Sequence, residues 1–210
     1  EVLAREKNPS IRSGAISGLA GHDDLETEKL INEALVSKSF RHQMGSAAIS
    51  AIRKQDDPNY LSNLQSVLEK DEKKFTSNGF ASGLRALGHL ARNEEDKSSV
   101  RQFLVARVNR LNRRVRTAAI EGLGQLNDSR AIAVLKKISA SRNDTPDRTA
   151  AEKAIETLRS GGKPSDDLKT LRKEVTDLKK DNQTLRQDLE DLKKRLDAAF
   201  GFEVPSSHSE

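Results

Sequence analysis

Apolar residues recur at helical spacing throughout residues 1–162, and the pattern itself repeats along the chain. A five-residue core of small and aliphatic residues occurs five times, and its second residues lie 33, 35, 36 and 35 positions apart, at Ile16, Ile49, Leu84, Ile120 and Ile155. A fixed period in this range predicts a stack of two-helix units in which each unit covers the face of its neighbour. No window alternates apolar and polar residues over the length of a strand. The predicted fold class is therefore all-α.

A polar turn follows each of the first four cores and separates it from a second apolar helix. The turns lie at residues 22–24, 56–59, 93–96 and 127–129, and each contains Asp, Asn or Ser. These side chains accept hydrogen bonds from the free N–H groups at the start of the next helix. The fifth unit, from Arg148, has the pattern of a truncated end unit.

Two glycine pairs lie four residues apart in the first helices, Gly14 with Gly18 and Gly79 with Gly83. Residues without a side chain allow close approach of backbones. Both pairs are predicted to permit close contact between helices.

Residues 116–123 read Arg-Thr-Ala-Ala-Ile-Glu-Gly-Leu, and the turn 127–129 and a second helix with Ile132 and Leu135 follow them. This arrangement resembles the short bacterial type of HEAT repeat, in which a first helix with Arg and small residues precedes an Asp turn. The resemblance implies a HEAT-like α-solenoid of about 4.5 two-helix repeats. It also implies that Arg116 and Arg12 have structural roles beside neighbouring Asp turns.

Residues 166–199 have a different pattern, a heptad repeat that predicts a coiled-coil helix. Nine of the ten a and d positions from residue 168 to residue 199 are apolar. So narrow a stripe on a charged helix is buried only against a partner helix of the same period. The predicted dimerisation residues are Leu168, Leu171, Val175, Leu178, Asn182, Leu185, Leu189, Leu192 and Leu196.

Charges beside the stripe favour a parallel homodimer. In parallel strands each g residue meets an e residue of opposite sign in the partner: Asp167 with Arg172, Glu174 with Lys179, Asp181 with Arg186, and Asp188 with Lys193. Antiparallel strands would place like charges together. Each exposed pair contributes only about 0.2–1 kcal/mol, but all of them change sign together. Asn182 at a central a position favours the same arrangement, since two such amides pair in parallel dimers. The alternative is a single helix folded back on its own repeats.

Composition excludes several kinds of site. The chain has no Cys and no Trp, which excludes disulfides and thiolate metal sites and fits a cytoplasmic protein and an exported protein without disulfides equally well. Its four histidines never stand four apart or beside a set of carboxylates, so no metal site and no cofactor are predicted. His22 and His42 are interpreted as polar turn or helix-start residues. No run of 18 apolar residues occurs, so no membrane-spanning helix is expected.

Positive charge is concentrated in the repeats, because the coiled-coil segment is neutral while the whole chain carries a formal charge of +5. A basic solenoid surface can bind phosphate or an acidic segment. The residues predicted to bind an acidic partner are Arg107, Arg110, Arg113 and Arg114. Nucleic acid is the less favoured partner, because Phe103 is the one aromatic residue there that could stack on a base.

The predicted organisation is a repeat domain at 1–162, a linker at 163–165, a coiled-coil helix at 166–199 and a disordered tail at 200–210. Short repeats, the linker from Gly161 to Pro164 and a leucine zipper, in this order, resemble the non-catalytic C-terminal region of bacterial M1-family zinc aminopeptidases. The resemblance implies an upstream catalytic domain that holds the zinc. Residues 1–5 begin without Met and have the pattern of a helix end, so a fragment of a longer protein is expected.

These features predict a non-enzymatic scaffold and homodimerisation region. The alternative function is a basic HEAT-repeat adaptor for an acidic protein segment or nucleic acid. Salt distinguishes the two, since a complex driven by counterion release weakens steeply with salt and a leucine seam does not.

Overall fold

The computed structural model describes residues 6, 8–22, 24–141, 145–160 and 166–200. In the last range, the side chains of 166–173, 176, 179 and 197–200 are outside the described part. The chain divides into two compact units, Glu1–Pro164 and Ser165–Glu210. The predictions for residues 1–5, for the linker 163–165 and for the tail after residue 200 fall outside the described residues.

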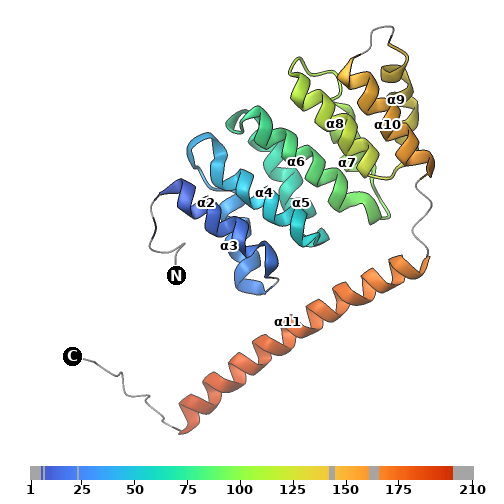
Figure 1. The fold of residues 1–210 in the computed structure, drawn as a ribbon. Helices are drawn as coiled ribbons and strands as arrows, with labels where there is room; N and C mark the ends of the chain where they lie inside the picture. Colours follow the sequence, from blue (N-terminus) through green and yellow to red (C-terminus); the bar gives the residue numbers. More distant parts are fainter. Residues whose placement is uncertain (1–5, 7, 23, 142–144, 161–165, 201–210) are drawn as a thin grey trace. The chain divides into compact units, whose positions relative to one another are not determined.

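The first unit is built from pairs of helices, and no strand forms among the described residues (Figure 1). The first helices of the pairs are α2 (Pro9–Gly18), α4 (Gln43–Gln55), α6 (Ser77–Leu90), α8 (Arg113–Gln125) and α10 (Pro146–Ser160). The second helices are α3 (Leu25–Leu35), α5 (Leu61–Lys70), α7 (Ser98–Val105) and α9 (Ile132–Ser139). Short 3₁₀ turns connect them: η1 (Leu19–Gly21), η2 (Phe40–His42), η3 (Pro58–Tyr60), η4 (Glu72–Lys74), η5 (Ala91–Asn93) and η6 (Ser129–Ala131). The predicted all-α solenoid is confirmed.

Polar residues of the turns accept hydrogen bonds where the second helices, or the 3₁₀ turns that lead into them, begin. The Asp24 carboxylate accepts a hydrogen bond from the backbone N–H of Thr27 at 2.9 Å, at the start of α3. Asp57, Asp96 and Asp128 accept similar bonds from residues two positions later, at 2.9, 2.9 and 3.0 Å. Each bond satisfies an N–H group that has no partner within the helix.

Small residues allow the first helices to pack closely against each other. A Cβ atom added to Gly88 would lie 2.2 Å from the carbonyl oxygen of Gly122, so α6 and α8 approach backbone to backbone. A Cβ atom on Gly83 would lie 2.5 Å from the Leu68 side chain, and one on Gly79 would lie 2.5 Å from Ser46. The prediction of close contact is confirmed for Gly79 and Gly83.

The same prediction is wrong for Gly14 and Gly18. A Cβ atom on either residue would have nothing within 4 Å among the described residues. The physical reason is position: α2 belongs to the first described pair, so no described helix precedes it in the stack.

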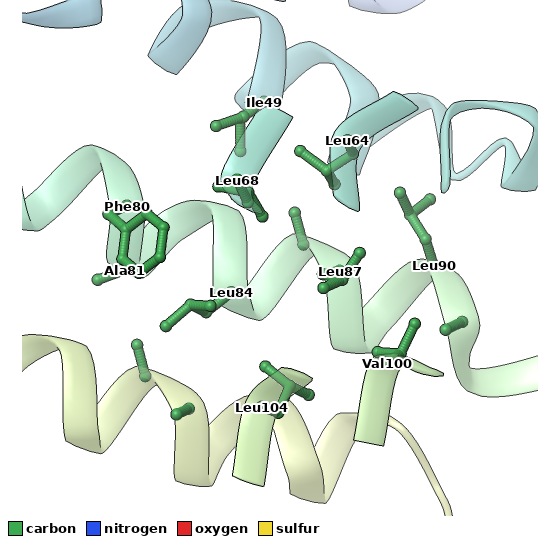
Figure 2. Close-up of a cluster of buried hydrophobic side chains, with 14 of the residues drawn as sticks. Ile49, Leu64, Leu68, Phe80, Ala81, Leu84, Leu87, Leu90, Val100 and Leu104 are labelled. Carbon is green, nitrogen blue, oxygen red and sulfur yellow. The ribbon is translucent and has the colours of Figure 1, made fainter. Parts of the chain in front are cut away.

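A continuous aliphatic core runs between the helix pairs. Leu64, Leu68, Leu84, Leu87 and Leu104 are fully buried, and α4, α5, α6 and α7 all contribute to this part of the core (Figure 2). Ile16 and Ile31 extend the core into the first pair, and Ile120, Leu123 and Leu135 extend it into the fourth. Each pair therefore shares its apolar surface with its neighbours, as expected for stacked repeats.

The last pair has one described helix, α10, which packs against α8 and α9. Its inner residues Ala151, Ala154 and Leu158 are buried, while Glu152, Lys153, Glu156 and Arg159 are exposed. A helix with one apolar and one charged side can end a stack, since its outer surface needs no further neighbour.

The second unit contains one long helix, α11 (Asp166–Phe200). Its length is well beyond that of the repeat helices, and its sequence is polar outside the heptad stripe. An isolated helix of this kind depends on a partner for much of its stability.

Candidate functional site

Ion pairs join adjacent repeats and fix their register. Arg92 of the third pair donates a hydrogen bond from Nη1 to Asp56 Oδ1 at 2.6 Å, across to the second pair. Arg85 pairs with Glu121, and Arg101 pairs with Asp128. Because each of these arginines pairs with a carboxylate of an adjacent repeat, its role is to stabilise the packing of the solenoid.

Arg116 has the structural role that the family resemblance implies. Its Nε donates to Asp147 Oδ2 at 2.8 Å, and Asp147 also accepts a bond from the Thr117 hydroxyl at 2.7 Å. The corresponding Arg12 differs, because its buried Nε has no hydrogen-bond partner among the described residues.

Asp128 is the most buried carboxylate of these pairs, at 5% exposure. Burial acts to raise its pKa, but hydrogen bonds from Arg130 and Arg101 outweigh burial and hold the pKa below its ordinary value. Asp128 thus remains ionised at neutral pH and binds two arginines at the turn between α8 and α9.

His42 is buried, in contrast to its interpretation as a polar turn residue. It stands just before α4, as predicted, but only 2% of its side chain is exposed and its φ of 52° is left-handed. The ring stacks on Phe75, and Nε2 lies 3.7 Å from Asp71. Burial lowers the pKa of His42, and the nearby Asp71 carboxylate opposes this effect only partly. A histidine in a turn gives no sequence signal of such a stack.

The four arginines predicted to bind an acidic partner occupy two different environments. Arg107 is 9% exposed; it donates to Glu72 Oε2 at 3.0 Å, and its guanidinium lies 3.4 Å from the centre of the Phe103 ring. Because these contacts cover its charge, the structure assigns Arg107 to the packing between repeats. The sequence around position 107 contains several apolar residues, and it does not indicate that the Arg107 side chain will pack on Phe103.

Arg110, Arg113 and Arg114 are exposed, at the loop before α8 and its first turn. Arg110 pairs with Glu72 at 2.9 Å, and Arg114 donates to the neutral amide oxygen of Asn78 at 2.9 Å. Arg113 has no ion pair among the described residues. Two of these charges are therefore not neutralised by a carboxylate in the described part of the chain.

The apolar stripe of α11 faces outward along its described length. Exposure ranges from 46% at Val175 to 67% at Leu189, and Leu178, Leu185, Leu192 and Leu196 lie between these values. Asn182 is exposed within the same stripe. Leu168 and Leu171 belong to α11, but their side chains are outside the described part. Within the second unit, the leucines whose side chains are described form an exposed apolar surface that no other described helix of that unit covers.

The central repeats match a known family. Residues 81–156 are similar to HEAT repeats. The matched range runs from within α6 to within α10. This region is a HEAT-like helical repeat, and the fold is an α-solenoid of that kind. No curated protein matches the chain.

The described residues contain neither a cluster of metal-binding side chains nor a membrane-spanning helix. No group of three or more His, Cys, Asp or Glu residues is arranged to hold a metal ion there. In the same part of the chain, no helix is both long enough and apolar enough to cross a membrane. Two surfaces in the described part have features suited to recognition, the stripe on α11 and the basic residues near α8.

Proposed function

We propose that this segment is a non-catalytic scaffold that joins two identical chains through a parallel coiled coil of α11. The observation that carries the proposal is the exposed leucine stripe on a helix of 35 residues. Burying a leucine contributes about 1.5–3 kcal/mol, so pairing the stripe supplies the stabilisation that the isolated helix lacks. The HEAT-like repeats support a scaffold or interaction role for the first unit.

Charges on α11 support two identical strands in parallel. Glu174, Asp181 and Asp188 are exposed on one side of the stripe, and Arg186 and Lys193 on the other. In a parallel pair of identical helices each acidic residue meets a basic one, and in an antiparallel pair like charges meet. Asn182 lowers the stability of the seam but specifies two strands in register.

The test of dimerisation is a double substitution in the stripe. The variant Leu178→Lys with Leu185→Lys is expected to be monomeric by light scattering, while the solenoid keeps its thermal transition. Thr184→Lys with Gln187→Lys is the matched control, because it adds the same charge outside the stripe and should remain dimeric. A Leu178/Leu185 variant that stays dimeric would exclude the proposed seam.

Strand orientation can be tested with one cysteine, since the chain has none of its own. Leu192→Cys in a parallel dimer places the two thiols side by side, and mild oxidation should give a disulfide-linked dimer. In an antiparallel dimer paired about Asn182 they would lie roughly 30 Å apart, at 1.5 Å per residue. A dimer that resists crosslinking would rule out the parallel arrangement.

We also propose that the parent protein is a zinc aminopeptidase of the M1 family. The order of repeats, linker and zipper, which resembles the C-terminal region of M1-family zinc aminopeptidases, supports placing this segment downstream of such a catalytic domain. Reading the coding sequence ahead of Glu1 tests this directly. A zinc-binding motif of two histidines four apart with an intervening glutamate is expected there, and a different domain would refute the assignment.

A further inference from the structure

The loops that connect successive repeats lie along one edge of the first unit. The α3–α4, α5–α6 and α7–α8 connections are found at this edge, and the turns within each pair lie at the opposite edge (Figure 1). We call the first the loop edge, formed by residues 36–42, 71–76 and 106–114. Stacking of helical hairpins places all connections of one kind on the same side.

The two edges differ in charge. The turns within the pairs contain the capping carboxylates Asp24, Asp57, Asp96 and Asp128. The loop edge has two described acids, and both are occupied: Asp71 pairs with Lys74 at 2.6 Å, and Glu72 pairs with Arg107 and Arg110. The basic residues that have no ion pair among the described residues are Lys38, Arg41, Lys73, Arg113 and Arg114. The loop edge is therefore positively charged.

Leu111 lies in the α7–α8 loop beside the arginines of this edge, and its side chain is almost fully exposed. It is 98% exposed, the highest value among the exposed large apolar residues of the described part. Exposed leucines are common singly, but this one is flanked by Arg110, Arg113 and Arg114 on a loop. Phe40, at 73% exposure and beside Arg41, repeats the combination in the α3–α4 loop.

The loop that carries Leu111 is held in place. Arg116 Nη1 donates to the carbonyl oxygens of Arg110 and Leu111, at 3.0 and 2.9 Å, and Asp147 fixes Arg116 in turn. Asn112 accepts from the N–H groups of Arg114 and Val115, which caps α8. Its Nδ2 also donates to Ser77 Oγ at 2.7 Å. A leucine displayed by so constrained a backbone loses little conformational freedom when it binds.

We propose that the loop edge around Leu111 is a docking site for an acidic protein segment with apolar side chains. Leu111 is the apolar anchor, and the forked guanidinium groups of Arg113 and Arg114 bind carboxylates of the segment. This inference goes beyond the proposed scaffold and dimer function, and it does not depend on the coiled coil.

Other ligands fit the loop edge less well. Nucleic acid would use aromatic stacking, but the aromatic residue next to this loop, Phe103, lies buried beneath Arg107, and the exposed Phe40 belongs to a different loop, α3–α4. A bilayer favours a broad apolar face, whereas the α7–α8 loop presents a single fixed leucine. A protein segment with carboxylates around an apolar contact matches both features.

The experiment is a selection of random 12-residue displayed peptides on the complete chain at low salt. Enriched peptides are expected to combine Asp or Glu with Leu, Phe or Trp. One selected peptide, labelled with a fluorophore, then serves as the probe for affinity by fluorescence anisotropy. A selection without acidic, apolar peptides would overturn the proposal.

Two variants locate the binding. Leu111→Asp is expected to weaken the peptide at least tenfold, and Arg113→Glu with Arg114→Glu should do the same and reduce the dependence on salt. The matched controls are Leu25→Asp, an exposed leucine at the opposite edge, and Arg53→Glu with Lys54→Glu in the last turn of α4; both should bind as the unchanged chain does. Equal binding by the Leu111 variant would refute the site.

Two further measurements separate this inference from its alternatives. Vesicles of phosphatidylserine and phosphatidylcholine should not retain the chain, and retention that Leu111→Asp abolishes would replace the peptide partner with a bilayer. The monomeric Leu178→Lys, Leu185→Lys variant should bind the peptide unchanged. Loss of binding in that variant would show that peptide binding requires the coiled-coil dimer, and it would contradict a docking site formed by the repeats alone.

Discussion

The imidazole ring of His42 lies parallel to the phenyl ring of Phe75, with ring centroids 4.1 Å apart. Gly45 makes this position available, because a Cβ atom there would lie 2.3 Å from His42 Nδ1. The stack joins the α3–α4 connection to the α5–α6 connection, and it buries a titratable side chain that is only 2% exposed.

Burial of His42 predicts stability that depends on pH. Its folded pKa is lowered from the ordinary 6.5, chiefly by burial, so the folded state favours the neutral ring. The contribution of the neutral His42 ring to the free energy of unfolding is fully present above about pH 6.5, and it is lost as the pH falls toward the folded pKa. Each unit of lowering corresponds to about 1.4 kcal/mol. Thermal unfolding measured from pH 8 to pH 5 should show a constant midpoint above neutrality and a decline below pH 6.5.

His42→Asn is the control for this pH dependence, because asparagine accepts the left-handed backbone but does not titrate in the range. The variant should be less stable at pH 8 and should show a flatter decline between pH 7 and pH 5. An equal slope in both proteins would assign the pH dependence to other groups.

Replacing a glycine of a first helix with alanine should change the stability of the fold in opposite directions at two positions. Gly88→Ala places a methyl group against the backbone of α8 and should destabilise the fold by about 1–3 kcal/mol. Gly14→Ala, inside α2, meets open space and should stabilise the helix by about 0.5–1 kcal/mol. Urea unfolding of both variants measures the difference. Destabilisation by Gly14→Ala would show that α2 is covered by a part of the chain outside the described residues.

Removal of the buried carboxylate Asp128 should be costly. Asp128→Asn leaves Arg101 without its ionic partner in a largely buried position, and a loss of about 2–3 kcal/mol is expected. Asp96→Asn is the control, because Asp96 is exposed and asparagine also caps a helix, so its effect should be small. Differential scanning calorimetry compares the two variants, and equal transition temperatures would contradict the assigned role.

The sequence predicts much of the repeat fold because the relevant signals are local. The spacing of Ile16, Ile49, Leu84 and Ile120 indicates where the first helices lie, and Asp24 and Asp57 indicate where turns end. These features depend on helical periodicity and capping, which each segment expresses alone.

Features that depend on neighbouring repeats could not be predicted. Nothing near Arg107 in the sequence indicates that Glu72 and Phe103 will enclose it. Gly14 and Gly79 have the same four-residue pattern, yet only Gly79 meets another helix. Leu111 gave one weak signal, a single apolar residue in a polar loop, but its complete exposure depends on how Arg116 holds the backbone.

The principal helix contacts of the repeat unit join neighbours: α2 with α4, α4 with α6, α6 with α8, and α8 with α10. A small rotation at one junction is therefore resisted mainly there, and rotations at successive junctions add along the row. The curvature of the row can in this way change through many slight adjustments, each too small to open the leucine core at any one junction.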